Sequence, residues 1–481
     1  MQPATLRTST IPAILILAAA ASTPRAAAAE ESAEAAARRP NIIFLLTDDQ
    51  RWDALGCMGN PIIETPHIDR LAQEGVVFDH CFVTTSICMT NRASIFSGQY
   101  AARHGIIDFR TEFTPPQLAE TYPALLKDAG YYLGFIGKWG VGHPPEGLFD
   151  FDTGWPGQHH FFPERNDPTR HLTAIMGEEA IEFLEGAPDD RPFCLSISFK
   201  APHVQDGDPA NFPQWIQDLY EEFPGGFLYD PALEPLYRDV VIPPVPLMEP
   251  EHFAALPDFL QATENRRRWK WRFATPEMYQ RSVKAYYRLI TGVDLVVGRI
   301  VEALREQELL EDTVILFHSD NGFYLGERGF AGKWFGHEES IRVPLVVFDP
   351  SLPERQRGTR RQQFALSIDI APTILEMAGA VIPEGVQGRS LVPVLAESSH
   401  SWREEFFYEH LFEHPAIPRS EGVRTQRHKY LRYLDSDPLY EELYDLEKDP
   451  HEANNLAGQP AHEALLETMR DSWSRWRERA R

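Results

Sequence analysis

The residues most able to do chemistry lie in the segment 86–98, which reads S-I-C-M-T-N-R-A-S-I-F-S-G. Its pattern predicts a helix that begins after Thr90 or Asn91, which would cap it. Cys88 would then lie at the positive end of the helix dipole, where backbone N–H groups can hold an anion. Arg92 falls on the same side of the helix one turn later and can neutralise whatever Cys88 becomes. The alternative interpretation is a buried free thiol in an ordinary strand-to-helix turn.

Two adjacent carboxylates, Asp48 and Asp49, follow the apolar run N-I-I-F-L-L at residues 41–46. A continuous apolar run is the pattern of a strand that is buried on both faces. Carboxylates at the end of such a strand repel each other and are costly to desolvate unless a cation lies between them. The pair therefore indicates a metal site, and a solvated turn is the alternative.

Apolar stretches of this kind alternate with helical patterns along the chain. The stretches predict strands at residues 41–46, 131–136, 193–199 and 313–317, and helical patterns cover residues 122–130 and 275–305. Each strand ends in a polar cluster, and the carboxyl ends of the strands of an open, doubly wound sheet meet in one crevice. The sequence therefore predicts an α/β fold in which these clusters form a single site.

Residues 88–92, C-M-T-N-R, followed by A-S-I-F-S-G at residues 93–98, resemble the signature of the type I sulfatases of the alkaline phosphatase superfamily. In that family a maturation enzyme oxidises the cysteine to formylglycine (3-oxoalanine), so the resemblance implies conversion of Cys88. The usual signature is Cys-x-Pro-Ser-Arg, and Thr90 and Asn91 replace its proline and serine. The resemblance extends over nearly all of the chain after residue 39.

The resemblance implies a large alkaline-phosphatase-like domain with a mixed, mostly parallel sheet between helices, and a small C-terminal α+β subdomain. It also implies a metal site, in which the ligands are Asp48, Asp49, the converted Cys88, Asp320 and Asn321. Oxygen ligands alone favour a hard cation, with calcium ahead of magnesium. An Asp-Asn pair at a strand end is otherwise a common turn.

Further positions match residues that contact the sulfate or the leaving group in the family. Lys138 follows the strand at 131–136, Lys333 lies in the segment G-E-R-G-F-A-G-K, and His203 ends the sequence K-A-P-H. The resemblance implies that the lysines spread the charge that develops on the sulfate. We expect His203 to be the general acid that protonates the leaving oxygen. The alternatives are solvated lysines and a structural histidine.

Gly140 stands where similar sulfatases often have a histidine that assists deprotonation of the hydrated aldehyde. His143 lies three residues further on and is a candidate replacement. We expect His143 and also His337, which lies in a segment that resembles the family, to contact the substrate.

The resemblance implies hydrolysis of a sulfate monoester, and we expect a sulfated carbohydrate, with N-acetylglucosamine 6-sulfate as the first candidate. By analogy with the family, hydrated formylglycine 88 attacks sulfur through one hydroxyl and later expels sulfate through the other. One alternative is a phosphomonoester or phosphonate monoester hydrolase of the same superfamily. Another is a catalytically silent glycan-binding protein, which Gly140, Thr90 and Asn91 make conceivable.

The net charge and the N-terminal sequence limit the classes of partner that the protein can bind and the compartment in which we expect it. The chain has 481 residues and a net charge of −25, which argues against nucleic acid or an anionic membrane as a partner. Residues 1–29 contain Arg7, then an apolar run at 11–21 and an alanine-rich end, the pattern of a cleaved signal peptide. The apolar run is shorter than the roughly 20 residues that span a bilayer. We therefore expect an exported protein, periplasmic or extracellular.

The expected domain plan has a spacer at residues 30–39, a catalytic domain at 40–395 and a C-terminal subdomain at 396–481 with a short antiparallel sheet and a terminal helix. Residues 205–261 are rich in proline and predict a long ordered insertion near the mouth of the pocket. The segment R-R-R-W-K-W-R at 266–272 could bind an acidic glycan, but a solvated face is the favoured interpretation. The four cysteines do not form a disulfide framework; a Cys57–Cys81 bridge and buried free thiols both stay open.

Overall fold

The computed structural model describes residue 1 and residues 39–163, 170–205, 226–397 and 401–481. The chain divides into two units, Met1–Arg39 and Pro40–Arg481. The predicted signal peptide lies outside the described residues, apart from Met1. Among the described helices, none combines the length and the apolar character that crossing a bilayer needs.

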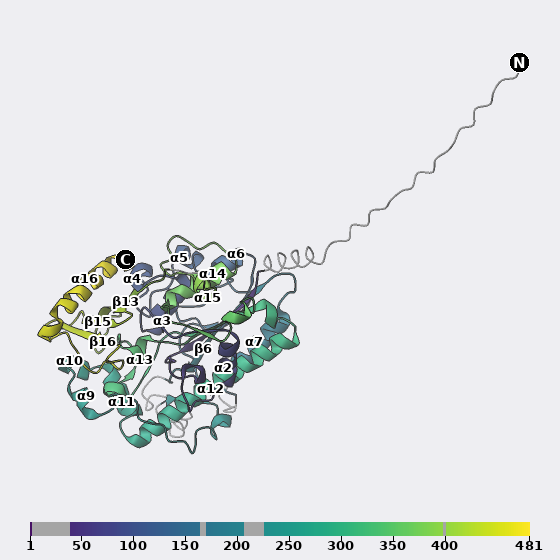
Figure 1. The fold of residues 1–481 in the computed structure, drawn as a ribbon. Helices are drawn as coiled ribbons and strands as arrows, with labels where there is room; N and C mark the ends of the chain where they lie inside the picture. The colour runs from purple at the N-terminus through teal and green to yellow at the C-terminus, as the bar shows by residue number, and fades with distance from the viewer. Residues whose placement is uncertain (2–38, 164–169, 206–225, 398–400) are drawn as a thin grey trace. The chain divides into compact units, whose positions relative to one another are not determined.

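A central sheet of eight described strands organises the unit Pro40–Arg481 (Figure 1). Its order is β11-β2-β10-β7-β1-β6-β4-β5, in which β10 pairs antiparallel with both of its neighbours and the other pairs are parallel. The strands are β1 (Asn41–Asp48), β2 (Val76–Phe78), β4 (Tyr132–Lys138), β5 (Phe151–Trp155), β6 (Phe193–Pro202), β7 (Thr313–Ser319), β10 (Leu345–Phe348) and β11 (Thr359–Arg361). The predicted mixed, mostly parallel sheet is therefore present.

Strand β1 is buried on both faces, as its apolar run predicted. Ile43 and Leu45 belong to one hydrophobic core, and Ile42, Phe44 and Leu46 belong to the other. The first core is closed by α2 (Pro66–Glu74), α7 (Leu172–Gly186) and α12 (Pro276–Glu306), and the second by α3 (Cys88–Ser97), α6 (Tyr122–Asp128) and α14 (Ile370–Met377). Helices thus cover both faces of the sheet, which leaves the ends of the strands to form a site.

Strand β1 extends further than predicted, whereas the long helix α12 has nearly the predicted bounds. Strand β1 continues through Asp48 because Thr47 pairs with Ser319 and Asp48 with Pro202. The polar clusters thus begin inside the sheet ladder. Helix α12 agrees with its prediction, and the Thr275 hydroxyl accepts a hydrogen bond from the Met278 N–H at its start.

The start of α3 was predicted wrongly. The helix begins at Cys88, after Ile87, so Thr90 and Asn91 lie inside it and do not cap it. The Asn91 amide instead donates to the backbone oxygen of Asp320 at 2.7 Å and accepts from the Ser367 hydroxyl at 2.7 Å. The first contact ties the first turn of α3 to the end of β7, and the second ties it to η8 (Ser367–Asp369).

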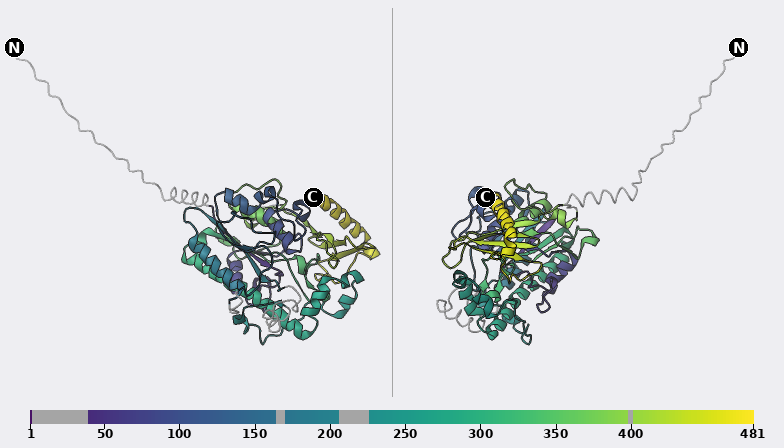
Figure 2. Two further views of the ribbon diagram at one scale, coloured as in Figure 1. Left: turned by 180° about the vertical axis from the view of Figure 1, so that it is seen from behind. Right: turned by 60° about the vertical axis from the view of Figure 1, so that its left-hand side comes forward.

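The C-terminal part of the chain forms a second sheet with a helix packed against it (Figure 2). Its elements are β13 (Glu405–His410), β14 (Ser420–Thr425), β15 (His428–Tyr433), β16 (Tyr440–Asp445) and α16 (Glu463–Ala480). Strands β14 and β15 pair antiparallel across a short turn, which agrees with the short antiparallel sheet expected here. The boundary between residues 395 and 396 stays a prediction, because Pro40–Arg481 is one compact unit.

The insertion expected at residues 205–261 lies partly outside the described residues. Its described part, from residue 226, contains η4 (Pro231–Leu233), α9 (Pro250–Ala254) and α10 (Asp258–Gln261), and the arginine-rich segment that follows is helix α11 (Glu264–Arg272). All four cysteines are free thiols, so the bridge between Cys57 and Cys81 is not formed.

Candidate active site

The end of β1 delivers two carboxylates to the centre of the molecule. Asp48 and Asp49 are both buried, and Asp49 adopts a left-handed backbone conformation with φ of 70°. Helix α12 holds this turn, because the Tyr286 hydroxyl donates to the backbone oxygen of Asp49 at 2.8 Å and accepts from the Arg51 N–H at 3.0 Å. Tyr286 was not predicted, since nothing local distinguishes it from other tyrosines of the apolar face of α12.

Helix α3 brings Arg92 to the same carboxylates. The guanidinium is fully buried and lies 2.7 Å from an Asp320 carboxylate oxygen and 3.6 Å from Asp48 Oδ2. It also donates to the backbone oxygen of Lys138 at 2.8 Å and to the Ser198 hydroxyl. Burial opposes the charge, but the two carboxylates raise the pKa of Arg92. The sequence predicts that Arg92 acts on Cys88; the structure places it against Asp320 and Asp48.

Two lysines bring further positive charge to the site. Lys138, the last residue of β4, donates to Asp48 Oδ2 at 2.6 Å. Lys333, which follows β9 (Ala331–Gly332), donates to Asp49 Oδ1 and lies 3.7 Å from Asp48 Oδ1. Burial opposes their charges, yet the neighbouring carboxylates raise the pKa of both lysines. Both ammonium groups are therefore cationic at neutral pH.

The three carboxylates respond differently to this environment. Burial disfavours the charged form of each one. Burial is opposed at Asp48 by Lys138, His203, Lys333 and Arg92, which together hold its pKa well below the usual value. Burial dominates at Asp49 and raises its pKa to about 7, even though Lys333 opposes this rise. Burial and the charge of Asp48 also raise the pKa of Asp320. A further positive charge between these carboxylates would keep all of them ionised.

The site fits a metal cation. Asp48 Oδ1 and Asn321 Oδ1 are buried acceptors without a hydrogen-bond partner among the described residues. Ligand atoms of Asp48, Asp49 and His203 all lie within 4.8 Å of one another. The Asn321 side-chain nitrogen donates to Asp320 Oδ1 at 2.7 Å. The Asn321 side-chain oxygen therefore points away from Asp320. Carboxylate and amide oxygens are the ligands that hard cations prefer.

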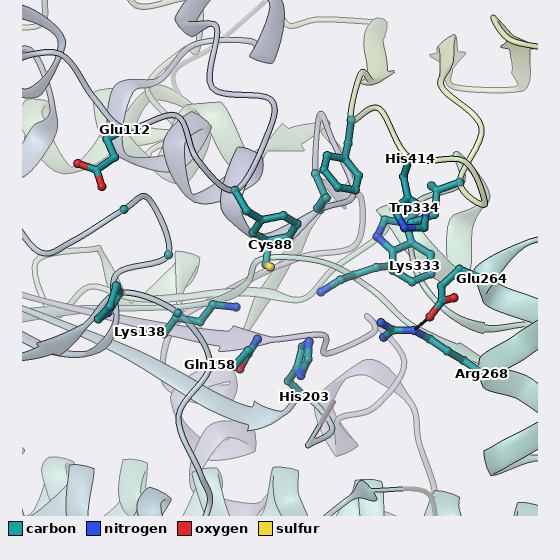
Figure 3. A pocket seen from close by; sticks show the side chains of 18 of the residues that line it. Cys88, Glu112, Lys138, Gln158, His203, Glu264, Arg268, Lys333, Trp334 and His414 are labelled. Carbon is teal, nitrogen blue, oxygen red and sulfur yellow. Dashed lines mark hydrogen bonds and ion pairs between the residues drawn. The ribbon is translucent and has the colours of Figure 1, made fainter. Parts of the chain in front are cut away.

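Cys88, Lys138, His203 and Lys333 line one cavity of about 690 Å³, and Figure 3 shows them converging on its centre. We call these four residues the cavity floor. The His203 Nδ1 atom lies 2.6 Å from the backbone oxygen of Val204, so Nδ1 carries a proton and Nε2 is the atom 3.5 Å from Asp49 Oδ2. This geometry brings together the predicted nucleophile, both lysines and the predicted acid.

The structure treats the two expected substrate histidines differently. His143 lines the cavity and is highly exposed, with its Nδ1 atom 3.5 Å from a Glu112 carboxylate oxygen. His337 is buried outside the cavity lining. One of its ring nitrogens lies 2.6 Å from the Tyr324 hydroxyl and the other 3.1 Å from a Glu442 oxygen. Both ring nitrogens of His337 therefore have protein partners, and its contact with the substrate stays a prediction.

Gln158 is a cavity residue that the sequence interpretation missed. Its amide donates to Asp48 Oδ2 at 3.2 Å. It lies three residues after β5, a strand whose sequence F-D-T-G-W has no continuous apolar run. The rule that polar residues follow strands would have identified Gln158 if β5 had been recognised.

Comparisons with known proteins show the family of this chain. The family profile described as Sulfatase matches residues 40–380, and the profile for the C-terminal region of N-sulphoglucosamine sulphohydrolase matches residues 326–479. An N-acetylglucosamine-6-O-sulfatase of Bacteroides thetaiotaomicron is 30% identical, over 87% of this chain and 83% of that protein. The human N-sulphoglucosamine sulphohydrolase is 26% identical, over 91% of this chain and 89% of that protein.

A solved structure, described as a complex with its substrate D-glucosamine-2-N,6-O-disulfate, is 26% identical. It covers 92% of this chain and 98% of its own chain with a TM-score of 0.74. This likeness confirms the predicted fold class.

Gly140 occupies a position that no larger residue fits. Its φ is 82°, and a Cβ atom at this position would lie 2.5 Å from Arg92 Cδ. The space that a histidine at this position would need is therefore filled by Arg92. His143 does not enter this space, since its side chain is exposed at the cavity rim.

We predict that Gly140→Ala destabilises the protein more than Gly147→Ala. Gly147 has a similar φ of 73°, but a Cβ atom there would meet nothing within 4 Å, so its substitution carries only the backbone penalty of about 1–2 kcal/mol. Gly140→Ala adds overpacking against Arg92, worth about 1–3 kcal/mol. Denaturant unfolding of the two variants measures the difference, and equal losses would contradict the steric argument.

Proposed function

Because the chain belongs to the sulfatase family and is a sulfuric ester hydrolase, we propose that its substrate is a glycan that carries a 6-sulfated glucosamine. The observation that carries this proposal is the convergence of Cys88, Lys138, His203 and Lys333 on the floor of one open cavity. The printed names of two similar proteins, an N-acetylglucosamine-6-O-sulfatase and a complex with a disulfated glucosamine, support the choice of sugar.

We propose that Asp48, Asp49, Asp320 and Asn321 hold calcium, with residue 88 in its formylglycine form completing the site. When present, the aldehyde hydrate supplies the attacking oxygen and the cation lowers the pKa of its proton. The buried acceptor atoms Asp48 Oδ1 and Asn321 Oδ1 support the cation. Conversion of Cys88 requires a maturation enzyme, and the predicted signal peptide supports export to the periplasm or the exterior.

The cationic residues in and beneath the floor bind the sulfate and hold the carboxylates in place. Lys138 and Lys333 place cationic nitrogens at the cavity, where they bind the nonbridging sulfate oxygens and oppose the charge that develops on them. Arg92 is a positioning residue, because it is fully buried and contacts Asp320, Asp48 and the backbone of Lys138. It keeps the carboxylates in place and compensates their charge.

His203 protonates the leaving oxygen as the bond between sulfur and that oxygen breaks. Its Nδ1 proton is committed to the backbone oxygen of Val204, so the second proton of the imidazolium is on Nε2, the atom beside Asp49. A sugar alkoxide is a poor leaving group that needs this proton. Water supplies the remaining atoms, so the products are the sugar alcohol and inorganic sulfate.

We expect activity to depend on conversion of Cys88. Protein made together with a formylglycine-generating enzyme should release sulfate from N-acetylglucosamine 6-sulfate, while protein made without it and the Cys88→Ala variant should be folded and inactive. Mass spectrometry of the tryptic peptide that carries residue 88 reports the conversion, since the aldehyde form is lighter than the cysteine form. Turnover by Cys88→Ala, or faster release from an aryl phosphate than from an aryl sulfate, would overturn the proposal.

Calcium should stabilise the folded protein. Binding at 100 times the dissociation constant adds about 2.7 kcal/mol to the free energy of unfolding, and chelation should remove this gain in a thermal unfolding experiment. Asn321→Leu, which deletes a proposed ligand, should lose most of the calcium-dependent shift, whereas Asn60→Leu, away from the cavity lining, should keep it. Active protein that contains no metal would refute the site, and a larger shift with magnesium would refute the choice of ion.

His203→Ala should affect two substrates unequally. Activity on the sugar sulfate should fall by about 100-fold to 10,000-fold, the usual effect of removing a positioned acid, and activity on nitrophenyl sulfate should fall much less because nitrophenolate leaves without a proton. His252→Ala, on α9 and outside the cavity lining, serves as the control. Equal losses on both substrates would make His203 a ligand of the sulfate, and no loss on either would make it structural.

A further inference from the structure

The cavity carries aromatic side chains that the mechanism proposed above does not use. Phe109, Phe412 and His414 line it together with the floor, and we call these three residues the aromatic rim. Phe109 is 60% exposed, whereas all residues of the floor are buried. Figure 3 shows His414 on the far side of the cavity from Lys138. The rim therefore lies nearer to the solvent than the groups that face the reacting sulfate.

Phe109 does not contribute to the hydrophobic core. Among the described residues it belongs to none of the three apolar clusters, whereas Phe412 packs against the cluster that contains Ile87 and Trp334. A single exposed apolar side chain is common on a protein surface, but Phe109 also lines the cavity that holds the floor. Aromatic side chains are typical of the lining of ligand pockets. A contact with the ligand therefore explains the placement of Phe109 better than packing does.

The rings of the rim contact one another in ordered geometries. The centres of the Phe109 and Phe412 rings are 5.4 Å apart, and the ring planes make an angle of 87°. The centres of the Phe412 and His414 rings are 5.9 Å apart, and these rings are tilted by only 18°. Aromatic pairs prefer such edge-to-face and offset stacked arrangements. The rim is therefore oriented before a ligand binds, which reduces the entropy that binding costs.

A contact between two distant parts of the chain holds the rim together. Phe109 lies in the segment after α4 (Ala101–His104), and the other two residues of the rim lie in the loop after β13. The Ala102 N–H at the start of α4 donates to a Glu409 carboxylate oxygen on β13 at 2.9 Å. This hydrogen bond keeps the two segments that carry the rim beside each other.

The rim is also tied to helix α3, which begins with Cys88. Burial lowers the pKa of His104 to about 3, so its ring is neutral. Its Nδ1 atom accepts from the Ile106 N–H at 3.0 Å, so Nε2 carries the proton and donates to the Ser94 hydroxyl on α3 at 3.0 Å. Phe109 follows three residues after Ile106. The distance between the rim and residue 88 is therefore set by packed structure.

The chemistry of the rim suits the ring of a sugar. A pyranose ring presents C–H groups with weak positive charge, and the face of an aromatic ring carries partial negative charge. Their contact also removes apolar surface of both rings from water. The sulfated sugar lies over the floor, because its sulfate is bound there. A ring that contacts the more exposed rim is therefore the neighbouring sugar of the same glycan.

We propose that Phe109 and Phe412 stack against the sugar that is linked to the sulfated glucosamine, so that the enzyme prefers oligosaccharides to the free sulfated monosaccharide. This inference rests on the proposed function of the floor. The contact is made by an uncharged ring face and needs no second anionic group. Each neighbour of the sulfated sugar has such a face, and the experiment distinguishes the two.

The experiment compares kcat/KM for a sulfated monosaccharide and two sulfated disaccharides whose second sugar is neutral. Matured enzyme is assayed with N-acetylglucosamine 6-sulfate, with the same sugar carrying galactose on its nonreducing side, and with the same sugar linked to galactose on its reducing side. At least one disaccharide should be preferred by about twofold to tenfold, the size of an aromatic contact. The preferred disaccharide identifies which neighbour contacts the rim.

Phe109→Ala should reduce this preference ratio to near one. It should raise KM for the preferred disaccharide and leave kcat unchanged, because the rim contacts the substrate and the transition state equally. Phe109→Tyr retains an aromatic ring and should retain the preference. The control is Leu439→Ala, which shortens an apolar side chain that is 45% exposed outside the cavity lining and should leave the ratio unchanged. Thermal unfolding of each variant checks that it is folded.

Failure of this inference can be distinguished from failure of the proposed function. If the wild-type enzyme hydrolyses all three sugars equally well, or if Phe109→Ala keeps the full preference, the rim does not bind the neighbouring sugar. An equal loss of kcat on the monosaccharide and the disaccharides in Phe109→Ala would show an effect on the floor and would also overturn the inference, as would a preference that disappears in Leu439→Ala. If matured enzyme hydrolyses none of the 6-sulfated sugars, the proposed function is wrong and the inference falls with it.

Discussion

The structure depends on the need to keep three neighbouring carboxylates, Asp48, Asp49 and Asp320, buried in one place. Buried like charges repel strongly, because little water screens them. Among the described residues, three cations form ion pairs with these carboxylates: Arg92 from α3, Lys138 from β4 and Lys333 after β9. These cations come from distant parts of the sequence, so the fold must be complete before the charges can compensate one another.

The sheet satisfies this requirement through its strand order. Strand β1 lies between β6 and β7, with β4 beyond β6, so the carboxyl ends that carry Asp48, Lys138 and Asp320 come together. Strands buried between two helical layers move little, and a site that they carry keeps its geometry. Gly140 also helps to hold the site together, because the absence of a side chain there leaves room for Arg92.

The cavity has two parts, the floor and the side formed by α11 and Trp334. The floor brings the ammonium groups of Lys138 and Lys333 together, and its groups are deeply buried, which strengthens each electrostatic contact. Another side of the cavity is formed by Trp334 and by helix α11, on which Arg267 is exposed and Glu264 is buried. The Asn265 amide on α11 donates to the backbone oxygen of Lys333, and this contact keeps the spacing of the two parts constant.

The sequence by itself determined the main strands, the α/β class and the polar clusters at the strand ends, because apolar runs and the residues that follow them are local patterns. Spacing alone also placed Arg92 one turn after Cys88, but it was the structure that showed Cys88 to be the first residue of the helix. The tertiary structure decided what each polar side chain contacts. Asn91, which was expected as a helix cap, lies inside α3 and donates a hydrogen bond to the backbone of Asp320, 229 residues away. His337 is engaged by Glu442, 105 residues away, and Arg268 faces the cavity only because α11 packs beside Trp334. Such partners are distant in sequence, so no local periodicity encodes them.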